Sequence, residues 1–328
     1  MRNEDPLHSP LSTLHYPLST MHYPLSTTHY PLSNAIPELL PGHRADDRRL
    51  SILGVEITDV TRRRAVELLE DMAQDYQGRD QPSVGARRVF FVNAHTLNLA
   101  ATDRRYREVL RAAECVFGDG TGVRWAGYLQ GVRVRDNLVG TDLVPALFRE
   151  TAGRGYRYFL LGSDQETVRR AALHAAEAFP GWIQAGFHHG YLTAADLTAA
   201  AIEQINQSRP HVLLVGMGNP LQEHWIHAHR HALKVPVCMG VGGLFDYWAG
   251  NVARAPQWLR SLGHEWMWRL WEQPADKAKR YLVGNPLFLA RILREVWITR
   301  CRRLHSAVGQ ASSLTIPPSD KSPVRLEA

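Results

Sequence analysis

The residues best suited to chemistry lie in the stretch VFGDGTGVRWAG, residues 116–127, where Asp119 stands between two glycines after a short apolar run. A carboxylate at the end of a strand could accept a proton from a substrate hydroxyl and act as a general base. Aspartate is also common in tight turns, because its side chain bonds to the nearby backbone. The spacing alone leaves both roles open for Asp119.

Three other apolar runs end in glycine or amide residues. Glycine lets backbone N–H groups approach an oxyanion, and the helix that follows each run adds a favourable dipole. The amides could hydrogen-bond a substrate or stabilise their own loops, and a second carboxylate competes with Asp119. The candidates, beside Gly120, are Asn93 in FVNAHT, Gly216, Gly218, Asn219 and Gln222 in VGMGNPLQE, and Gly242, Gly243 and Asp246 in MGVGGLFD.

Common nucleotide-binding and hydrolase motifs match poorly. A dinucleotide-binding turn requires G-x-G-x-x-G, but GDGTGV has Val123 at the third glycine position and GMGNPLQ has Leu221. There is no Walker A lysine pattern, no G-x-S-x-G nucleophile elbow and no H-E-x-x-H helix. A nucleotide-dependent, NAD-type oxidoreductase that uses the glycine loops remains as a weak alternative.

The elements that must position these residues follow a regular pattern. Short apolar runs alternate with amphipathic helices over 49–250, which predicts an α/β domain with a doubly wound, mostly parallel, Rossmann-like sheet. Ligands of such sheets bind beyond the carboxyl ends of the strands, which is where the candidate loops fall. Residues 50–58 are expected to form one strand. Thr61, Asp103 and Ser163 are expected to cap helices.

The two ends of the chain differ from this domain. Residues 1–48 contain the tandem repeat LSTLHYP, LSTMHYP, LSTTHYP, whose recurring proline excludes a continuous helix, so a disordered low-complexity region is expected. Residues 251–308 are expected to form a helical, basic appendage, and 309–328 a disordered tail. Eleven Lys and Arg residues against four acidic ones lie in 251–304, so the positive charge is concentrated there.

The composition of the appendage favours an anionic membrane surface as its partner. Five of the nine tryptophans lie among its arginines, and this combination suits a lipid headgroup interface. Its apolar runs are too short to span a bilayer, and no helix–turn–helix or RNA-binding signature supports a nucleic-acid partner. Three widely separated cysteines indicate a reducing compartment. We expect a cytoplasmic protein at the inner face of the plasma membrane, with a homo-oligomer left open.

Longer segments resemble one protein family. NAHTLNLAATDRRYREVLRAAECVFGDGTGVRWA, LLVGMGNPLQEHWI and VCMGVGGLFDYWAGNVARAPQWLRSLGHEWMWRLWEQPADKAKRYLVGNPLFL resemble the signature blocks of the WecG/TagA/CpsF glycosyltransferases, glycosyltransferase family 26. The resemblance implies an inverting transfer of a hexose-type sugar from a UDP-sugar to a saccharide on a polyprenyl diphosphate, in exopolysaccharide or cell-surface polysaccharide synthesis. It also implies that Asp119 is the catalytic base and that Asn93 and Gln222 are active-site amides.

The chain departs from the pattern of this family in two places, of which the first is Phe91-Val92-Asn93, where many members have Thr-Pro-Asn. Asn137 stands where an arginine is common, and the form RDN resembles the xanthan-type exopolysaccharide branch, whose members transfer glucose. This resemblance favours UDP-glucose as the donor over UDP-N-acetylmannosamine.

The leaving diphosphate of such a reaction needs hydrogen-bond donors and positive charge. Backbone N–H groups of the glycine loops are expected to bind it, together with Arg254, Arg260 and Arg269 of the appendage, because a guanidinium donates two hydrogen bonds at once. No D-x-D-type acidic pair stands at the end of a predicted strand. We therefore expect a reaction that needs no metal and no other cofactor.

Overall fold

The computed structural model describes the chain in segments, and residue contacts divide the chain into Met1–Ile36 and Pro37–Ala328. The described residues all belong to the second of these units: 44, 47–76, 85–256, 259, 265–272, 274 and 278–313. Nearly all of the predicted low-complexity region 1–48 lies outside them, as does the predicted tail from residue 314 onward.

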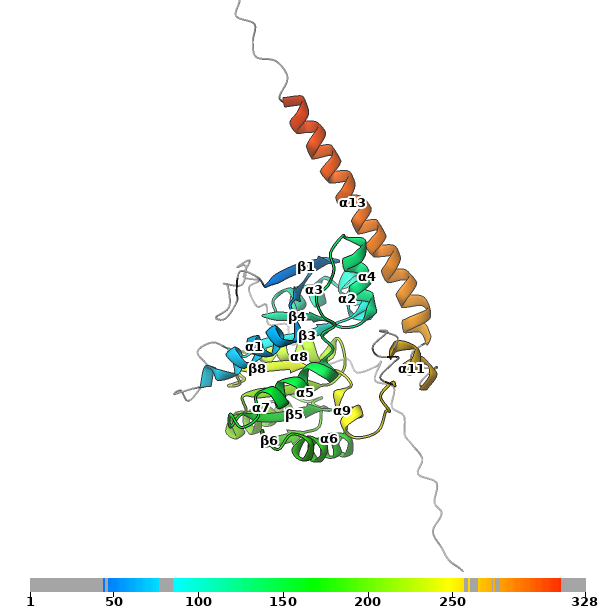
Figure 1. The fold of residues 1–328 in the computed structure, drawn as a ribbon. Helices are drawn as coiled ribbons and strands as arrows, with labels where there is room; N and C mark the ends of the chain where they lie inside the picture. The colour runs from blue at the N-terminus through cyan, green and yellow to red at the C-terminus, as the bar shows by residue number, and fades with distance from the viewer. Residues whose placement is uncertain are drawn as a thin grey trace, which may run out of the picture. The chain divides into compact units, whose positions relative to one another are not determined.

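A six-stranded parallel sheet forms the centre of the domain, with the strand order β4-β3-β8-β7-β5-β6 (Figure 1). Apart from the edge strand β6, its strands are almost wholly buried, which is why they are mostly apolar. The predicted α/β class is confirmed. The strands are β3 (Arg87–Val92), β4 (Cys115–Gly118), β5 (Arg157–Gly162), β6 (Ile183–His188), β7 (Val212–Gly216) and β8 (Val237–Gly240).

Helices cover both faces of this sheet, because alternate side chains of each strand point to opposite sides. In β3, Val89 and Phe91 belong to one hydrophobic cluster and Phe90 and Val92 to the other. The first cluster contains α1 (Arg62–Ala73), α5 (Gly140–Glu150), α6 (Gln165–Ala178) and α9 (Leu244–Trp248). The second contains α2 (Ala94–Thr102), α3 (Arg104–Arg111), α4 (Thr121–Leu129), α7 (Ala195–Ser208) and α8 (Leu221–His229).

The segment predicted as a single strand at 50–58 is instead a hairpin. β1 (Arg48–Ile52) and β2 (Val55–Asp59) pair antiparallel as a separate two-stranded sheet. The turn between them places Leu53 and Gly54 at φ 49° and 77°, as two-residue hairpins of the I′ type require. The prediction was wrong because leucine is not a turn residue, so ILGV resembles an uninterrupted strand.

Two of the three predicted helix caps are confirmed. The side chains of Thr61 and Asp103 accept backbone N–H groups at the starts of α1 and α3. The third prediction was off by one residue, since Asp164 rather than Ser163 caps α6. The Asp164 carboxylate accepts the backbone N–H of Thr167 at 2.8 Å. A 3₁₀ turn, Gln74–Tyr76, follows α1.

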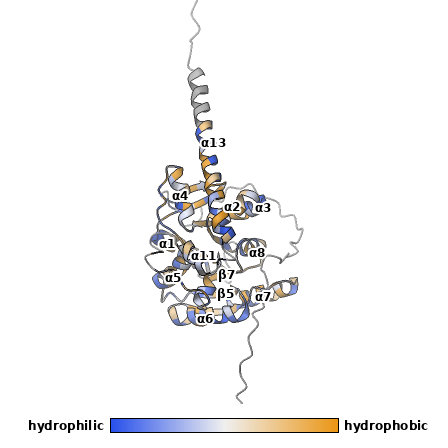
Figure 2. Cartoon of the chain, turned by 90° about the vertical axis from the view of Figure 1, so that its right-hand side faces the viewer, coloured by the Kyte–Doolittle hydropathy of each residue, from blue (hydrophilic) through white to orange (hydrophobic). Residues whose placement is uncertain are grey.

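The C-terminal segment is helical in its described part, as predicted. It contains α11 (Glu265–Glu272), the π-helical turn η3 (Lys279–Val283) and the long α13 (Gly284–Ser313), which continues past residue 308. α13 lies beside α2 and α4 (Figure 2), and its Phe288 and Ile292 are buried in the second cluster. None of the described helices has the length and hydropathy that a membrane span requires.

Candidate active site

Asp119 lies at the carboxyl edge of the sheet, directly after β4. Its backbone N–H donates to the carbonyl of Val92 at 2.8 Å, which extends the pairing of β3 and β4 by one residue. Gly120 follows with φ 91°, a conformation that glycine adopts without strain. Asp119 is thereby held half-buried at the wall of a cavity of about 480 Å³, within the size range of small-molecule sites.

The sheet topology creates a crevice beside this cavity. The neighbouring strands β3 and β8 are followed by α2 and α9, which pack on opposite faces of the sheet, as Leu97 and Leu244 show by belonging to different clusters. Ligands of open α/β sheets bind at such a switch in direction. Asn93, the first residue after β3, borders this crevice and also lines the cavity.

The side-chain oxygen of Asn93 has three hydrogen-bond donors. It accepts the backbone N–H groups of His95 at 3.0 Å and Thr96 at 3.3 Å, which makes Asn93 the N-cap of α2. It also accepts a hydrogen bond of 3.3 Å from the guanidinium of Arg280, in η3. Asn93 can therefore stabilise its own loop and line the candidate site at the same time.

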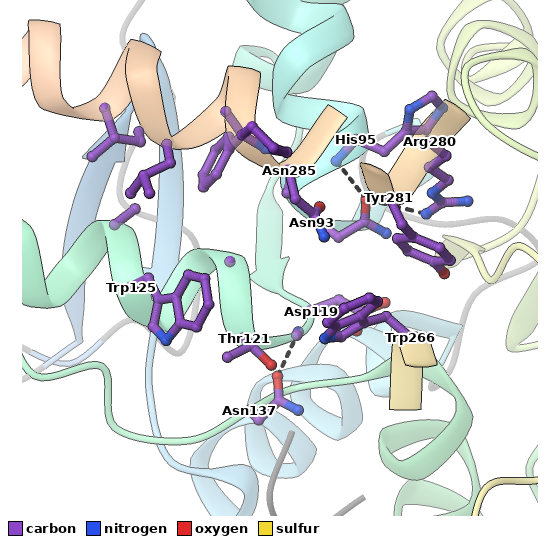
Figure 3. A pocket seen from close by; sticks show the side chains of 18 of the residues that line it. Asn93, His95, Asp119, Thr121, Trp125, Asn137, Trp266, Arg280, Tyr281 and Asn285 are labelled. Carbon is purple, nitrogen blue, oxygen red and sulfur yellow. Dashed lines mark hydrogen bonds between the residues drawn. The ribbon is translucent and has the colours of Figure 1, made fainter. Parts of the chain in front are cut away.

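Asn137 lies across the cavity from Arg280 and Asn93 (Figure 3). Its side-chain oxygen accepts the backbone N–H of Gly120 at 2.6 Å. Gly120 is the N-cap of α4 and has no side chain of its own for this purpose. The Asn137 amide therefore fixes the turn that carries Asp119.

Gln222 is almost fully buried, with 1% of its surface exposed. Its side-chain oxygen accepts the backbone N–H of Gly242 at 3.0 Å, and its amide nitrogen donates to the Glu223 carboxylate at 2.8 Å. Asn219 donates to the same carboxylate oxygen. These predicted site residues thus hold the loops after β7 and β8 together, and none of their side chains lines the cavity.

Burial gives Glu223 an unusual protonation equilibrium. The side chain is fully buried, and this removal from water raises the pKa of the carboxyl to about 7, although hydrogen bonds from Gln222 and Asn219 act in the opposite direction. A carboxyl group that titrates near neutral pH therefore accepts a hydrogen bond from Gln222, the residue that links the two loops.

The remaining glycine-loop candidates lie at the same edge but outside the cavity lining. A side chain at Gly216 would collide with the ring of Phe245, so this glycine allows α9 to pack closely. Gly218 has φ 80° and open space around it. Gly243 is the N-cap of α9, and Asp246 lies in the first turn of that helix.

Of the three predicted arginines, only Arg254 has a described side chain, and it does not line the cavity. Arg254 donates to the Asp142 carboxylate of α5 at 2.8 Å and lies over the ring of Tyr247. Arg260 lies outside the described residues, as does the side chain of Arg269. Among the described arginines of the appendage, Arg280, which was not predicted from the sequence, lies in the cavity wall. The segment KAKRY offered no signal that separated Arg280 from its basic neighbours.

Possible metal ligands do not gather in the described part of the chain, where no group of three His, Cys, Asp or Glu side chains converges. The polar groups around the cavity include a carboxylate, an imidazole, an indole N–H, amides, two hydroxyls and a guanidinium. Such groups can hold a polar substrate, take a proton from it and stabilise negative charge.

A parallel sheet with a carboxylate and a guanidinium at its carboxyl edge is the arrangement of an α/β enzyme that binds an anionic ligand at a switch point. Comparison with known proteins defines the class further. The chain belongs to the WecG/TagA/CpsF glycosyl transferase family, whose model matches residues 50–302. It is a glycosyltransferase, and the resemblance seen in its motifs is confirmed.

Two relatives share the name N-acetylglucosaminyldiphosphoundecaprenol N-acetyl-beta-D-mannosaminyltransferase. One, from Bacillus subtilis (strain 168), is 32% identical over 204 residues, which cover 62% of this chain and 78% of the relative. The other, from Staphylococcus aureus (strain NCTC 8325 / PS 47), is 30% identical over 254 residues, which cover 76% of this chain and 94% of the relative. Neither name refers to a xanthan-type branch.

Proposed function

We propose that this glycosyltransferase moves a hexose-type sugar from a UDP-sugar to a saccharide carried on a polyprenyl diphosphate, with inversion at the anomeric carbon. The single observation that carries the proposal is the position of Asp119, whose carboxylate lines the cavity at the carboxyl edge of the sheet. In an inverting transfer, one base removes the proton of the acceptor hydroxyl while that oxygen attacks the sugar and the nucleotide diphosphate leaves.

Asp119 alone accounts for only part of such a reaction. General base catalysis supplies roughly 10²–10⁴ in rate, so placement of the substrates and stabilisation of the leaving diphosphate must supply the rest. We assign the second task to Arg280, because its guanidinium is a positive charge in the cavity wall and its fork of N–H groups suits a phosphate. With this cation in place, the proposed transfer needs no metal.

N-acetylmannosamine is the sugar we propose first, because the names of both relatives state it as the transferred group. The same names support an N-acetylglucosaminyl diphosphate lipid as the acceptor. Glucose is the second candidate, supported by Asn137 in place of an arginine, which leaves this side of the cavity with a neutral amide bound to Gly120. The oxidoreductase alternative has no support from the family to which the chain belongs.

We further propose that the chain acts at the inner, cytoplasmic face of the plasma membrane, where a lipid-linked acceptor is accessible. Exposed aromatic and basic side chains of the C-terminal helices support this location. Trp271 in α11 and Trp297 in α13 are 83% and 67% exposed, and Arg294 and Arg300 are exposed on the same helix as Trp297. Such side chains suit a headgroup interface.

A donor panel tests the proposed reaction. The purified full-length chain is incubated with radiolabelled UDP-N-acetylmannosamine, UDP-glucose and UDP-N-acetylglucosamine, each with a synthetic N-acetylglucosaminyl diphosphate lipid. We expect transfer from UDP-N-acetylmannosamine that persists after EDTA treatment. Transfer from UDP-glucose alone would replace the proposed donor, and loss of transfer with EDTA would overturn metal independence. No transfer from any donor, combined with binding of NAD(H), would overturn the whole proposal.

A further inference from the structure

The cavity at Asp119 has two chemically different parts. Its polar part lies at the sheet edge, where Asp119, Asn93 and Arg280 are found. Its other part is an apolar wall between α4 and the C-terminal helices, formed by Trp125, Leu282, Phe288, Leu289 and Ile292. The proposed base does not require an apolar wall next to it. The wall therefore suggests that an apolar part of a ligand binds here.

The base of the wall is tightly packed. A side chain at Gly122 of α4 would approach the Cβ atom of Ala94 in α2 to 2.9 Å and the ring of Phe288 in α13 to 3.5 Å. Phe288 and Ile292 are buried in the second hydrophobic cluster. The helices α2, α4 and α13 thus pack closely against one another at the base of the apolar wall.

The rim of the wall is exposed. Trp125 is 54% exposed and Leu282 is 62% exposed, although both line the cavity. Large apolar side chains that remain exposed around a concave site indicate that a partner covers them. Figure 3 shows the Trp125 ring at the far side of the cavity from Arg280.

The chemistry of the two substrates identifies that partner. A UDP-sugar can pack only the flat uracil ring against an apolar surface and is otherwise polar, whereas the acceptor is a sugar joined to a long lipid that can cover the whole wall. Its hydroxyl must reach Asp119, so the rest of the acceptor extends from the polar part of the cavity. We infer that the wall between α4 and α13 binds the first isoprenoid units of the acceptor lipid, so the lipid is held by the protein itself before it enters the bilayer. This inference rests on the proposed function.

Soluble acceptors of increasing prenyl length, from dimethylallyl to geranylgeranyl, test the inference without vesicles. We expect kcat/KM to rise with each added unit and then to level off when the wall is covered. Trp125→Ala should lower kcat/KM for the geranylgeranyl acceptor roughly tenfold, since it removes a large apolar contact. The loss should be smaller for the dimethylallyl acceptor, because its single isoprenoid unit covers less of the wall.

Tyr128 provides the matched control. It is an exposed aromatic residue of the same helix, 80% exposed, but it does not line the cavity. Tyr128→Ala should keep the dependence on prenyl length. Equal losses in both variants, or a kcat/KM that does not change with prenyl length, would overturn the inference while leaving the proposed transfer intact.

A binding measurement separates the inference from the reaction. Farnesyl phosphate and isopentenyl phosphate are titrated against the full-length chain by calorimetry, and only farnesyl phosphate is expected to bind, with Trp125→Ala weakening it roughly tenfold. If farnesyl phosphate binds in this way but no sugar is transferred, the proposed function fails and the lipid site stands. If it does not bind and Trp125→Ala instead dissociates an oligomer in light scattering, the wall is an interface between copies of the chain and the inference is wrong.

Discussion

Arg280 donates a hydrogen bond of 3.3 Å to the side-chain oxygen of Asn93, although 187 positions separate the two residues in the chain. The bond connects the C-terminal segment to the end of a central strand of the sheet. α13 reinforces the connection, because Arg291 donates to the carbonyl and side-chain oxygens of Asn98 in α2. The appendage is therefore part of the wall of the site as well as a candidate membrane contact.

Replacement of Arg280 tests whether this wall takes part in the reaction. Arg280→Ala should lower kcat by roughly 10²–10³, as loss of one donor to developing negative charge typically does. Arg280→Lys should recover only part of the activity, because lysine keeps the charge but loses the paired donors of the guanidinium. Steady-state transfer assays with saturating donor measure both effects.

Arg294 supplies the control for this substitution. It lies on α13 and is exposed, so Arg294→Ala removes one positive charge from the same segment without touching the cavity. We expect its kcat in detergent to match that of the wild type. A similar loss in both variants would mean that net charge, rather than the guanidinium of Arg280, supports the activity.

Asp119→Asn tests the assignment of the base against the rival carboxylate. The substitution keeps the shape of the side chain but removes its ability to accept a proton, so kcat should fall by roughly 10²–10⁴. Binding of UDP, measured by calorimetry, should remain within a factor of about two, because the base acts on the acceptor hydroxyl. Asp246→Asn, outside the cavity lining, should retain most of the turnover. The reverse order of the two variants would reassign the base to Asp246.

Asn137 allows its contact at the site to be separated from its effect on stability. Asn137→Ala removes the acceptor for the backbone N–H of Gly120 and should cost at most about 1 kcal/mol of unfolding free energy. The kcat/KM should fall as well, because this contact fixes the turn that carries Asp119. Urea titration and steady-state kinetics measure the two effects.

The adjacent Asp136 gives a control with the same type of bond. Its carboxylate accepts the backbone N–H of Arg62 at the start of α1 at 2.7 Å, and it does not line the cavity. Asp136→Ala should therefore reduce stability to a similar degree and leave kcat/KM unchanged. If both variants lose activity equally, the loss follows from lower stability of this segment and not from the contact between Asn137 and Gly120.

The sequence predicts those parts of the molecule that depend on local pattern. Apolar runs and amphipathic periodicity gave the parallel sheet and its flanking helices, and glycine on both sides of Asp119 placed it at the sheet edge. The exact position of a single residue was harder to predict. Asp164 rather than Ser163 caps α6, and the sequence did not separate the two because either residue type can cap a helix. Contacts between distant segments could not be predicted. Arg280 reaches Asn93 only because α13 packs on α2 and α4.

The burial of Glu223 could not be predicted from the sequence either. This burial makes the unfolding free energy depend on pH. Burial raises the pKa of the folded protein's Glu223 to about 7 from an ordinary value of 4.5. Between these two pH values, the folded chain binds a proton that the unfolded chain has released, so unfolding free energy falls as pH rises. The full contribution is present below the unfolded pKa and is lost as pH passes through the folded pKa. The shift corresponds to about 3 kcal/mol.

Glu223→Gln isolates this contribution. The glutamine side chain keeps an oxygen to accept the hydrogen bonds from Gln222 and Asn219, but it cannot ionise. Urea unfolding of both proteins between pH 4.5 and pH 8.5 should show the wild type losing about 3 kcal/mol relative to the variant as pH rises. Other groups that titrate in this range are common to both proteins and cancel in the difference. Parallel stability curves would mean that Glu223 is ionised at neutral pH, so a buried negative charge would lie beside Gln222, which links the β7 and β8 loops.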